Sequence, residues 1–296
     1  MTFREVEEAR KNYWEATKKY LFISGGAALI VLILSLITGP LGVFAGLTFG
    51  VIILSAGIGI GSFLTNKHRL AYRKAYKGYF VEQNLRKIFT HVSYSHEQGF
   101  SPDVIKESGM MHLADRFYSN DTVIAKYQNI PFAQADVTLT RIYTDDKGNT
   151  HEYNVFKGRY MIFEFPKKFD YRLEVIGKKF KLSKVPGKFK NRKMTEIETE
   201  SPDFNRNFRV YGDDGFESFY LLAPDVIAKI EDIAVRYNYK LLLGFYDHKL
   251  VVALDDGKDA FEPPKFSHPL DEKTEMKKVA EDIKVITDFV DVISSH

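Results

Sequence analysis

The sequence predicts an α+β protein in which an N-terminal two-helix transmembrane hairpin precedes a strand-rich antiparallel cytoplasmic domain with flanking helices. Three observations predict this class. Residues 20–66 contain no Asp, Glu, Lys, Arg or His; the chain from residue 121 alternates apolar with polar residues and is rich in Val, Ile, Thr, Tyr and Phe; and helical spacing of apolar residues returns near the C-terminus. The predicted segments are an N-terminal cytoplasmic amphipathic segment at 1–19, the hairpin at 20–64, a juxtamembrane helical segment at 65–110 and a cytoplasmic α+β domain at 111–296.

The uncharged stretch divides into two spans, Tyr20–Thr38 and Leu41–Leu64. Each is about as long as the ~20 apolar residues that cross a bilayer core, and Gly39-Pro40 between them favours a turn. A secretory signal would have a shorter apolar core and a cleavage site, so we expect no cleavage. A buried helical hairpin of a large soluble protein is the alternative, although soluble helices of this length usually carry charge on one face.

Basic residues flank the two spans on one side. Lys18 and Lys19 precede the first span and a basic stretch begins at Lys67 after the second, whereas the connecting turn has no charge. Because positive residues stay inside, we expect a multi-pass protein of the cell membrane with both termini cytoplasmic. The chain has no cysteine, which excludes a disulfide scaffold, a thiolate metal site and a cysteine nucleophile.

The second span carries a strip of glycines on one helical face. Such strips let helix backbones approach closely in lipid, where packing drives association. The first span offers a similar face with Gly25, Ala28, Ser35 and Gly39, and a second copy of the chain is the alternative partner, which would give a homo-oligomer. The residues predicted to pack helix against helix are Gly42, Gly46, Gly50, Gly57 and Gly61.

Two basic clusters could meet the anionic lipid headgroups of the bilayer. One follows the second span, and the other lies in a stretch from Lys178 to Lys193 that is expected to be an exposed loop. Each basic residue near a charged membrane surface contributes about 1 kcal/mol. We expect no nucleic-acid partner, because the net charge of the whole chain is only +3. The candidate lipid contacts are Lys67, Arg69, Arg73, Lys74, Lys77, Lys178, Lys179, Lys190 and Arg192.

The elements after the spans follow from periodicity, caps and turn residues. A helix is expected over Lys67–His91, and a short helix should begin at Pro102 with Ser101 as its N-cap. A helix started by Pro224 should run to Tyr237, and an amphipathic helix should span Asp271–Ser294. The predicted strands are Thr122–Tyr127, Phe132–Tyr143, His151–Phe165, Tyr171–Ile176, a hairpin of Asn205–Tyr211 with Phe216–Leu222, and then Lys240–Tyr246 and Lys249–Leu254.

The aromatic residues of the 205–222 hairpin have two interpretations. They could form a ligand platform, but aromatics that alternate on a hairpin more often form half of a sheet core, which we favour. The residues concerned are Phe204, Phe208, Tyr211, Phe216, Phe219 and Tyr220.

Four blocks of residues, taken in order, resemble the bacterial family of domain of unknown function 3137. They are Asn154–Gly158 leading to Ile162–Phe165, then Pro202–Tyr211, Glu217–Pro224 and Ala260–Pro263. The resemblance implies a cytoplasmic domain preceded by two membrane spans. It implies no reaction, cofactor or catalytic residue.

The residue patterns of common catalytic and metal sites do not occur. None of the eight histidines has the i, i+4 spacing with a glutamate that a zinc hydrolase needs. The acidic turns lack the alternating oxygen ligands of a calcium loop, and no glycine-rich phosphate loop or Gly-x-Ser-x-Gly elbow appears. We therefore predict no catalytic residue, no cofactor and no metal.

The sequence thus favours a membrane-anchored cytoplasmic binding or scaffolding module, whose partner is an unknown protein or the lipid surface. Two alternatives remain. One is a hydrolase-like enzyme that uses carboxylates such as Asp213, Asp214 and Glu217, and the other is a structural subunit of a larger membrane complex.

Overall fold

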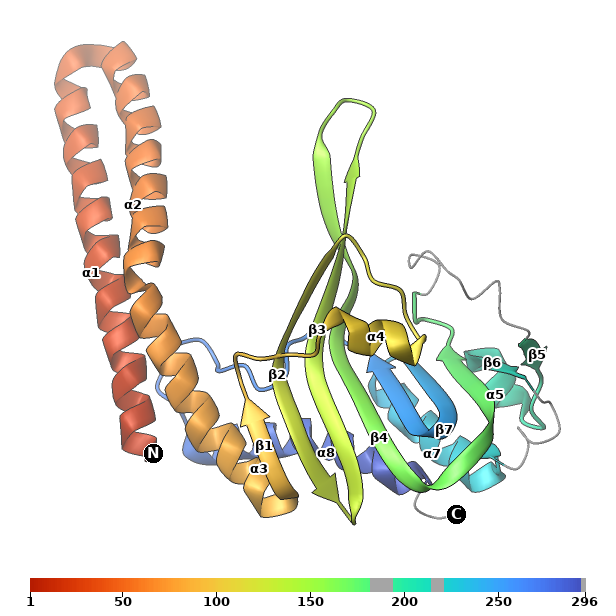
Figure 1. The fold of residues 1–296 in the computed structure, drawn as a ribbon. Coiled ribbons are helices and arrows are strands. Elements are labelled where there is room, and N and C mark those ends of the chain that lie inside the picture. Colours follow the sequence, from red (N-terminus) through yellow and green to blue (C-terminus); the bar gives the residue numbers. More distant parts are fainter. Residues whose placement is uncertain (182–193, 214–220, 294–296) are drawn as a thin grey trace. The chain divides into compact units, whose positions relative to one another are not determined.

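The computed structural model describes residues 1–181, 194–213 and 221–293. The chain forms two compact units, Met1–Gln83 with Glu262–Lys277, and Asn84–Phe261 with Lys278–His296. The predicted fold class is confirmed, because two long apolar helices open the chain and an antiparallel sheet with flanking helices follows (Figure 1).

Two helices joined by a tight turn open the first unit. Helix α1 (Phe3–Ser35) begins with a capping box, in which the Glu5 carboxylate accepts a hydrogen bond from the Thr2 backbone N–H at 2.7 Å and the Thr2 hydroxyl accepts one from the Glu5 N–H. A 3₁₀ turn, η1 (Leu36–Thr38), leads directly into α2 (Gly39–Tyr76). The turn precedes Gly39-Pro40 because proline, which lacks an N–H, is well accommodated in the first turn of a helix.

Both helices are long and apolar enough to cross a membrane. Their large apolar side chains are mostly exposed, for example Phe22 at 75%, Leu41 at 88% and Phe63 at 81%. Soluble proteins rarely expose apolar surface of this extent. The alternative of a hairpin buried inside a soluble protein therefore does not fit the first unit.

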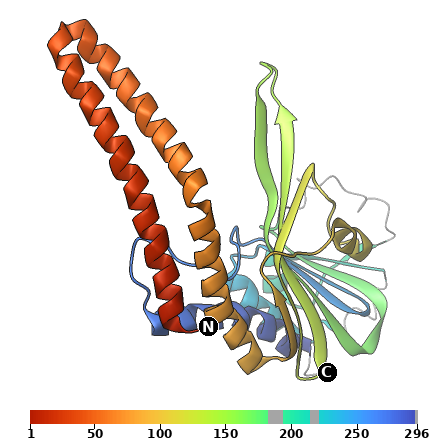
Figure 2. The ribbon, with the colours of Figure 1, turned by 60° about the vertical axis from the view of Figure 1, so that its left-hand side comes forward.

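Helices α1 and α2 lie side by side in both views (Figures 1 and 2). A Cβ added at Gly57 would lie 2.2 Å from the Cβ of Ser24, and one added at Gly46 would lie 2.4 Å from the Cβ of Ser35. At Gly61 an added Cβ would lie 2.9 Å from the Cβ of Tyr20, whereas at Gly50 the nearest atom, the Ala28 carbonyl oxygen, is 3.8 Å away. On α1, a Cβ added at Gly25 would meet no atom within 4 Å. Gly25 was expected to lie in the contact between the helices, and it does not.

The α-helical geometry of α2 changes to π-helical geometry after Tyr76. A five-residue π-helix, η2 (Lys77–Val81), is followed by α3 (Glu82–Ile88), and strand β1 begins at Thr90. The helix predicted to reach His91 therefore ends three residues earlier, because the chain from Thr90 pairs with β2.

A later segment of the chain, Glu262–Lys277, packs on α2 and η2 within the first unit. The Lys77 side chain is 1% exposed, and its ammonium group lies 2.9 Å from the Glu262 carboxylate, which also pairs with Arg73. Burial raises the pKa of Glu262, but the two cations outweigh burial and hold this pKa below its usual value. The Tyr76 hydroxyl donates a hydrogen bond to the Glu275 carboxylate at 2.6 Å. We call these contacts the polar clasp.

The described part of the second unit is built on a seven-stranded sheet whose pairings are all antiparallel. The spatial order is β1-β2-β3-β4-β6-β5, and β7 pairs with β4. The strands are β1 (Thr90–Ser95), β2 (Arg116–Tyr127), β3 (Ile130–Thr144), β4 (Thr150–Gly177), β5 (Thr195–Ile197), β6 (Phe208–Gly212) and β7 (Leu241–Leu254).

Strands β4 and β7 are each longer than predicted. The two strands expected at 151–165 and 171–176 form the single strand β4, and those expected at 240–246 and 249–254 form β7. Both strands bend, with β7 inside the bend of β4 (Figure 1), and their register shifts between Glu164 and Leu173. The residues that were expected to end the strands lie at these bends, and β4 pairs regularly with β7 again from Leu173.

The first strand of the hairpin predicted at 205–222 is confirmed over residues 208–211, where β6 forms, and is wrong over residues 205–207. Residues 205–207 end a short helix, α5 (Pro202–Asn207), whose N-cap Ser201 accepts a hydrogen bond from the Phe204 N–H at 3.2 Å. Strand β6 then pairs with β4 and β5. Residues 216–220 of the predicted partner strand lie outside the described residues. Phe204 and Phe208 are buried and stack at 4.3 Å, which confirms them as core residues.

Helices cover both faces of the sheet (Figure 1). Helix α4 (Pro102–Ser108), with Ser101 as N-cap and Pro102 first as predicted, lies on one face. Helix α7 (Pro224–Arg236) and the later part of α8 (Glu272–Ile293) lie on the other. The predicted bounds of α7 and α8 agree with these to within a residue.

The close approach of Gly57 to α1 gives a test of the hairpin packing. Substitution Gly57→Ala should destabilise the hairpin by about 1–3 kcal/mol, because the new methyl group overlaps Ser24 and the helices must separate. Substitution Gly59→Ala is the matched control, since its Cβ would meet no atom within 4 Å. The midpoint of SDS-induced unfolding in mixed micelles measures both effects. Equal midpoints for the two variants would contradict the contact.

Candidate functional site

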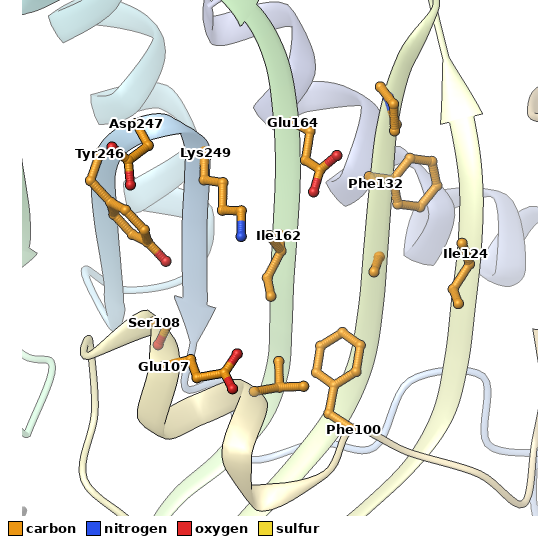
Figure 3. A pocket seen from close by; sticks show the side chains of 13 residues that line it. Phe100, Glu107, Ser108, Ile124, Phe132, Ile162, Glu164, Tyr246, Asp247 and Lys249 are labelled. Atoms are coloured by element: carbon orange, nitrogen blue, oxygen red, sulfur yellow. The ribbon is translucent and has the colours of Figure 1, made fainter. Parts of the chain in front are cut away.

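A cleft lies between α4 and one face of the sheet in the second unit (Figure 3). Its volume is about 520 Å³, within the ~300–1,000 Å³ typical of ligand pockets. Four neighbouring strands contribute to its floor: β2, β3, β4 and β7. Helix α4 supplies the opposite wall through Val104, Glu107 and Ser108, and it begins at Pro102, directly after the loop that carries Phe100.

Apolar side chains form the floor of the cleft. Ile124 of β2, Ala133 of β3 and Ile162 of β4 come from successive strands, and Ala133 and Ile162 are direct cross-strand partners. Phe100 closes one end (Figure 3). Ile124 is 53% exposed, so part of this apolar floor is open to solvent.

Charged side chains surround the floor. Glu107 comes from α4, Glu164 from β4, and Asp247 and Lys249 from the bend of β7 (Figure 3). Glu164 and Lys249 face each other across the β4–β7 pair. Within the part of the chain that the structure describes, none of these four side chains forms an ion pair or hydrogen bond. The cleft thus presents three carboxylates and one ammonium group.

A buried polar network fixes the wall below α4. The hydroxyls of Ser108 and Tyr160 share a hydrogen bond, and Arg172 donates to the Ser108 carbonyl oxygen at 3.0 Å. Arg172 also pairs with buried Glu174 at 3.0 Å and lies over the Tyr246 ring, 4.7 Å from its centroid. Burial raises the pKa of Tyr160, so its phenol stays neutral. The network ties α4 to β4 and β7.

A second polar cluster lies on the opposite face of the sheet. Asp136 of β3 and Arg159 of β4 are cross-strand partners, both almost fully buried. Arg159 pairs with Asp282 of α8 at 2.8 Å, and Asp136 accepts a hydrogen bond from the Ala260 N–H at 2.6 Å. Burial, with a smaller contribution from Asp121, raises the pKa of Asp136 well above its usual value, although Arg159 opposes this.

Several polar atoms of this second cluster have no partner among the described residues. They are both amide atoms of Gln134, Oδ1 of Asp136 and Nε of Arg159. Successive strand residues point to opposite faces, so Arg159 and Ile162 lie on different sides of β4. The buried carboxylate is therefore separated from the cleft by the sheet.

The predicted lipid contacts differ in exposure. Lys67, Arg69 and Lys74 are exposed on α2, whereas Arg73 is partly buried and Lys77 is buried in the polar clasp. Lys77 therefore has no surface to offer a headgroup. In the second unit Lys178 and Lys179 are exposed and donate to Asn205 and Asn238, and the predicted contacts Lys190 and Arg192 lie outside the described residues.

The carboxylates weighed for an enzyme do not form a site in the described chain. Asp213 is exposed and accepts a hydrogen bond from the Arg172 backbone N–H at 2.9 Å, and Asp214 and Glu217 lie outside the described residues. Among the residues described, no group of three His, Cys, Asp or Glu side chains could hold a metal ion.

Sequence reasoning missed the cleft. Glu107, Glu164 and Asp247 come from segments far apart in the chain, and no local spacing links them. One signal was present, because Glu164 continues the alternation of β4 on the same face as Ile162 and interrupts an otherwise apolar run.

Comparisons with known proteins agree with the predicted resemblance. The family described as "Protein of unknown function (DUF3137)" matches residues 154–294, which confirms that resemblance. The crystal structure of the mycobacterial trehalose monomycolate transport factor A, TtfA, is similar over 75% of this chain and 95% of that chain, with 9% identity and a TM-score of 0.36. At this score the likeness carries no argument about fold or function. No curated protein matches the chain.

The raised pKa of Asp136 gives a test of the interior cluster. A carboxyl whose pKa is raised by folding contributes stability below its unfolded pKa, and this contribution is lost as pH rises through the folded pKa. The variant Asp136→Asn lacks this titrating carboxyl. As pH rises, the free energy of unfolding of the wild type should therefore fall relative to that of the variant. Urea unfolding between pH 5 and pH 9 measures this difference. A pH-independent difference between Asp136→Asn and the wild type would refute the assignment.

Proposed function

We propose that this protein is a membrane-anchored binding module, in which the helical hairpin holds the strand-rich domain at the cytoplasmic surface and the α4 cleft binds a partner protein. The observation that carries the proposal is the combination of two exposed apolar helices with an open cleft on the domain that follows them. Anchoring confines the domain to the membrane surface and so raises the effective concentration of membrane-associated partners.

The cytoplasmic orientation is supported by the distribution of positive charge. Lys18 and Lys19 lie before the first apolar stretch and Lys67, Arg69 and Lys74 after the second, whereas the turn between them is uncharged. The last three side chains are exposed, which suits contact with anionic headgroups. A hairpin whose glycines contact its own first helix needs no second copy, so homo-oligomerisation is not part of the proposal.

Separation of Asp136 from the cleft favours binding over catalysis. A general acid or base with a shifted pKa must reach the substrate. Asp136, whose pKa is raised by burial, lies on the other face of the sheet, while Glu107, Glu164 and Asp247 surround the cleft and are exposed. This arrangement suits recognition of a partner.

Single cysteines can test the orientation, because the chain has none of its own. In intact cells a membrane-impermeant maleimide should label Leu41→Cys, next to the turn and 88% exposed, and should not label Asp146→Cys in the β3–β4 turn. Permeabilised cells should show labelling at both positions. Labelling of Asp146→Cys alone in intact cells would show the opposite topology and contradict the cytoplasmic placement.

A photoreactive benzophenone amino acid in the cleft can test the binding role. Placed at Ile124, on the cleft floor, it should give a discrete crosslinked adduct with another protein in cell membranes. Placed at Tyr143 on the β3–β4 hairpin, which is comparably exposed at 50% but does not line the cleft, it should not give that adduct. Absence of an adduct at Ile124, or the same adduct from both positions, would contradict a partner in the cleft.

A further inference from the structure

We propose that the occupant of the α4 cleft is an extended segment of a partner protein that carries apolar residues next to lysine or arginine. The apolar residues would lie between α4 and the sheet, and the basic side chains would meet the surrounding carboxylates. This inference rests on the proposed binding function and names the chemistry of its partner.

The dimensions of the floor fit an extended chain. The cleft crosses four neighbouring strands, from Ile124 on β2 to Lys249 on β7. Strands lie about 4.8 Å apart, so the floor is roughly 14 Å across. An extended peptide covers that distance with about four residues, since each advances by roughly 3.5 Å.

The apolar floor specifies part of the occupant. Ile162 and Ile124 present aliphatic surface, and Phe100 adds an aromatic face at one end (Figure 3). Removing apolar surface from water contributes about 25 cal/mol per Å². A purely charged ligand would leave this contribution unused, so the occupant should place apolar side chains here.

The charged residues around the cleft indicate that the occupant also carries positive charge. Glu107, Glu164 and Asp247 carry three negative charges against the single positive charge of Lys249. Because Lys249 faces Glu164 across the strand pair, Glu107 and Asp247 are left to attract an external cation. Charge complementarity of this kind steers association and excludes acidic partners. An arginine of the partner could also place its guanidinium over the Phe100 ring, as Arg172 of this chain does over the Tyr246 ring.

Hydrogen bonds fix one wall of the cleft. The hydrogen bonds of Ser108 to Tyr160 and Arg172 hold the end of α4 against the sheet. A preformed site has less ordering to complete on binding, which preserves affinity.

Three labelled peptides can test the inference by fluorescence anisotropy with the full-length protein in non-ionic detergent. The first contains Leu-Lys-Phe-Arg between Gly-Ser flanks, the second replaces its basic residues by Glu, and the third replaces its apolar residues by Ser. The first peptide should bind at least tenfold more tightly than either of the others, and its affinity should fall as salt is added, because exposed charges are screened. Equal binding of all three would overturn the inference.

Variants of the cleft locate the binding. The double substitution Glu107→Gln with Asp247→Asn removes two exposed charges and keeps the side-chain shape, and it should weaken the first peptide at least tenfold. Asp146→Asn is the matched control, since it removes one exposed carboxylate away from the cleft. If the peptide entered the detergent micelles without binding the cleft, its anisotropy signal would be the same for all variants. Unchanged affinity in the double variant would overturn the proposed role of these carboxylates.

The outcomes separate this inference from the proposed function. A crosslinked adduct from Ile124 with no binding of the first peptide would retain the binding function and refute the apolar-basic occupant. Loss of that adduct in the Glu107→Gln, Asp247→Asn variant would support both. An absent adduct would refute the function itself.

Discussion

The pairing of β4 with β7 is the interaction on which the second unit depends. Strand β4 is 28 residues long and also pairs with β3 and β6, so it connects both ends of the sheet. A strand of this length that bends would leave backbone groups unpaired unless a second strand followed the same path. Strand β7 does so, and its residues from Leu241 to Phe245 and from Leu250 to Leu254 are buried. The bend also brings Asp247 and Lys249 of β7 to the cleft that Glu164 of β4 lines.

A comparable constraint acts in the first unit at Lys77. The Lys77 side chain is 1% exposed, and a buried ammonium group is strongly destabilising unless it is paired. Glu262 supplies that pairing from a position 185 residues later in the chain. Arg73 shares the same carboxylate. The basic residues after the apolar helices therefore differ in environment, because some are exposed and others pair with a segment that is distant in the sequence.

Local information in the sequence was sufficient for the class of fold and for most elements. Absence of charge over residues 20–66 and the alternation of strands are properties of short windows, and caps such as Ser101-Pro102 placed helix starts correctly. Whether a strand ends or bends depends on a partner far away in the chain, which explains why β4 and β7 were each predicted as two strands. At Ser201-Pro202 the same cap signal was present, but the aromatic run after it favoured a strand. The cleft joins residues of α4, β2, β3, β4 and β7, so no short window contains it.

The alternation of β4 has a consequence for how this protein can diversify. Ile162 and Glu164 face the cleft, whereas the alternating residues Met161 and Phe163 are fully buried on the other side. In the proposed binding role, residues that would contact a ligand and residues that maintain the interior thus occupy separate positions of one strand. Substitution of the first set would change the surface of the cleft without opening a cavity in the interior.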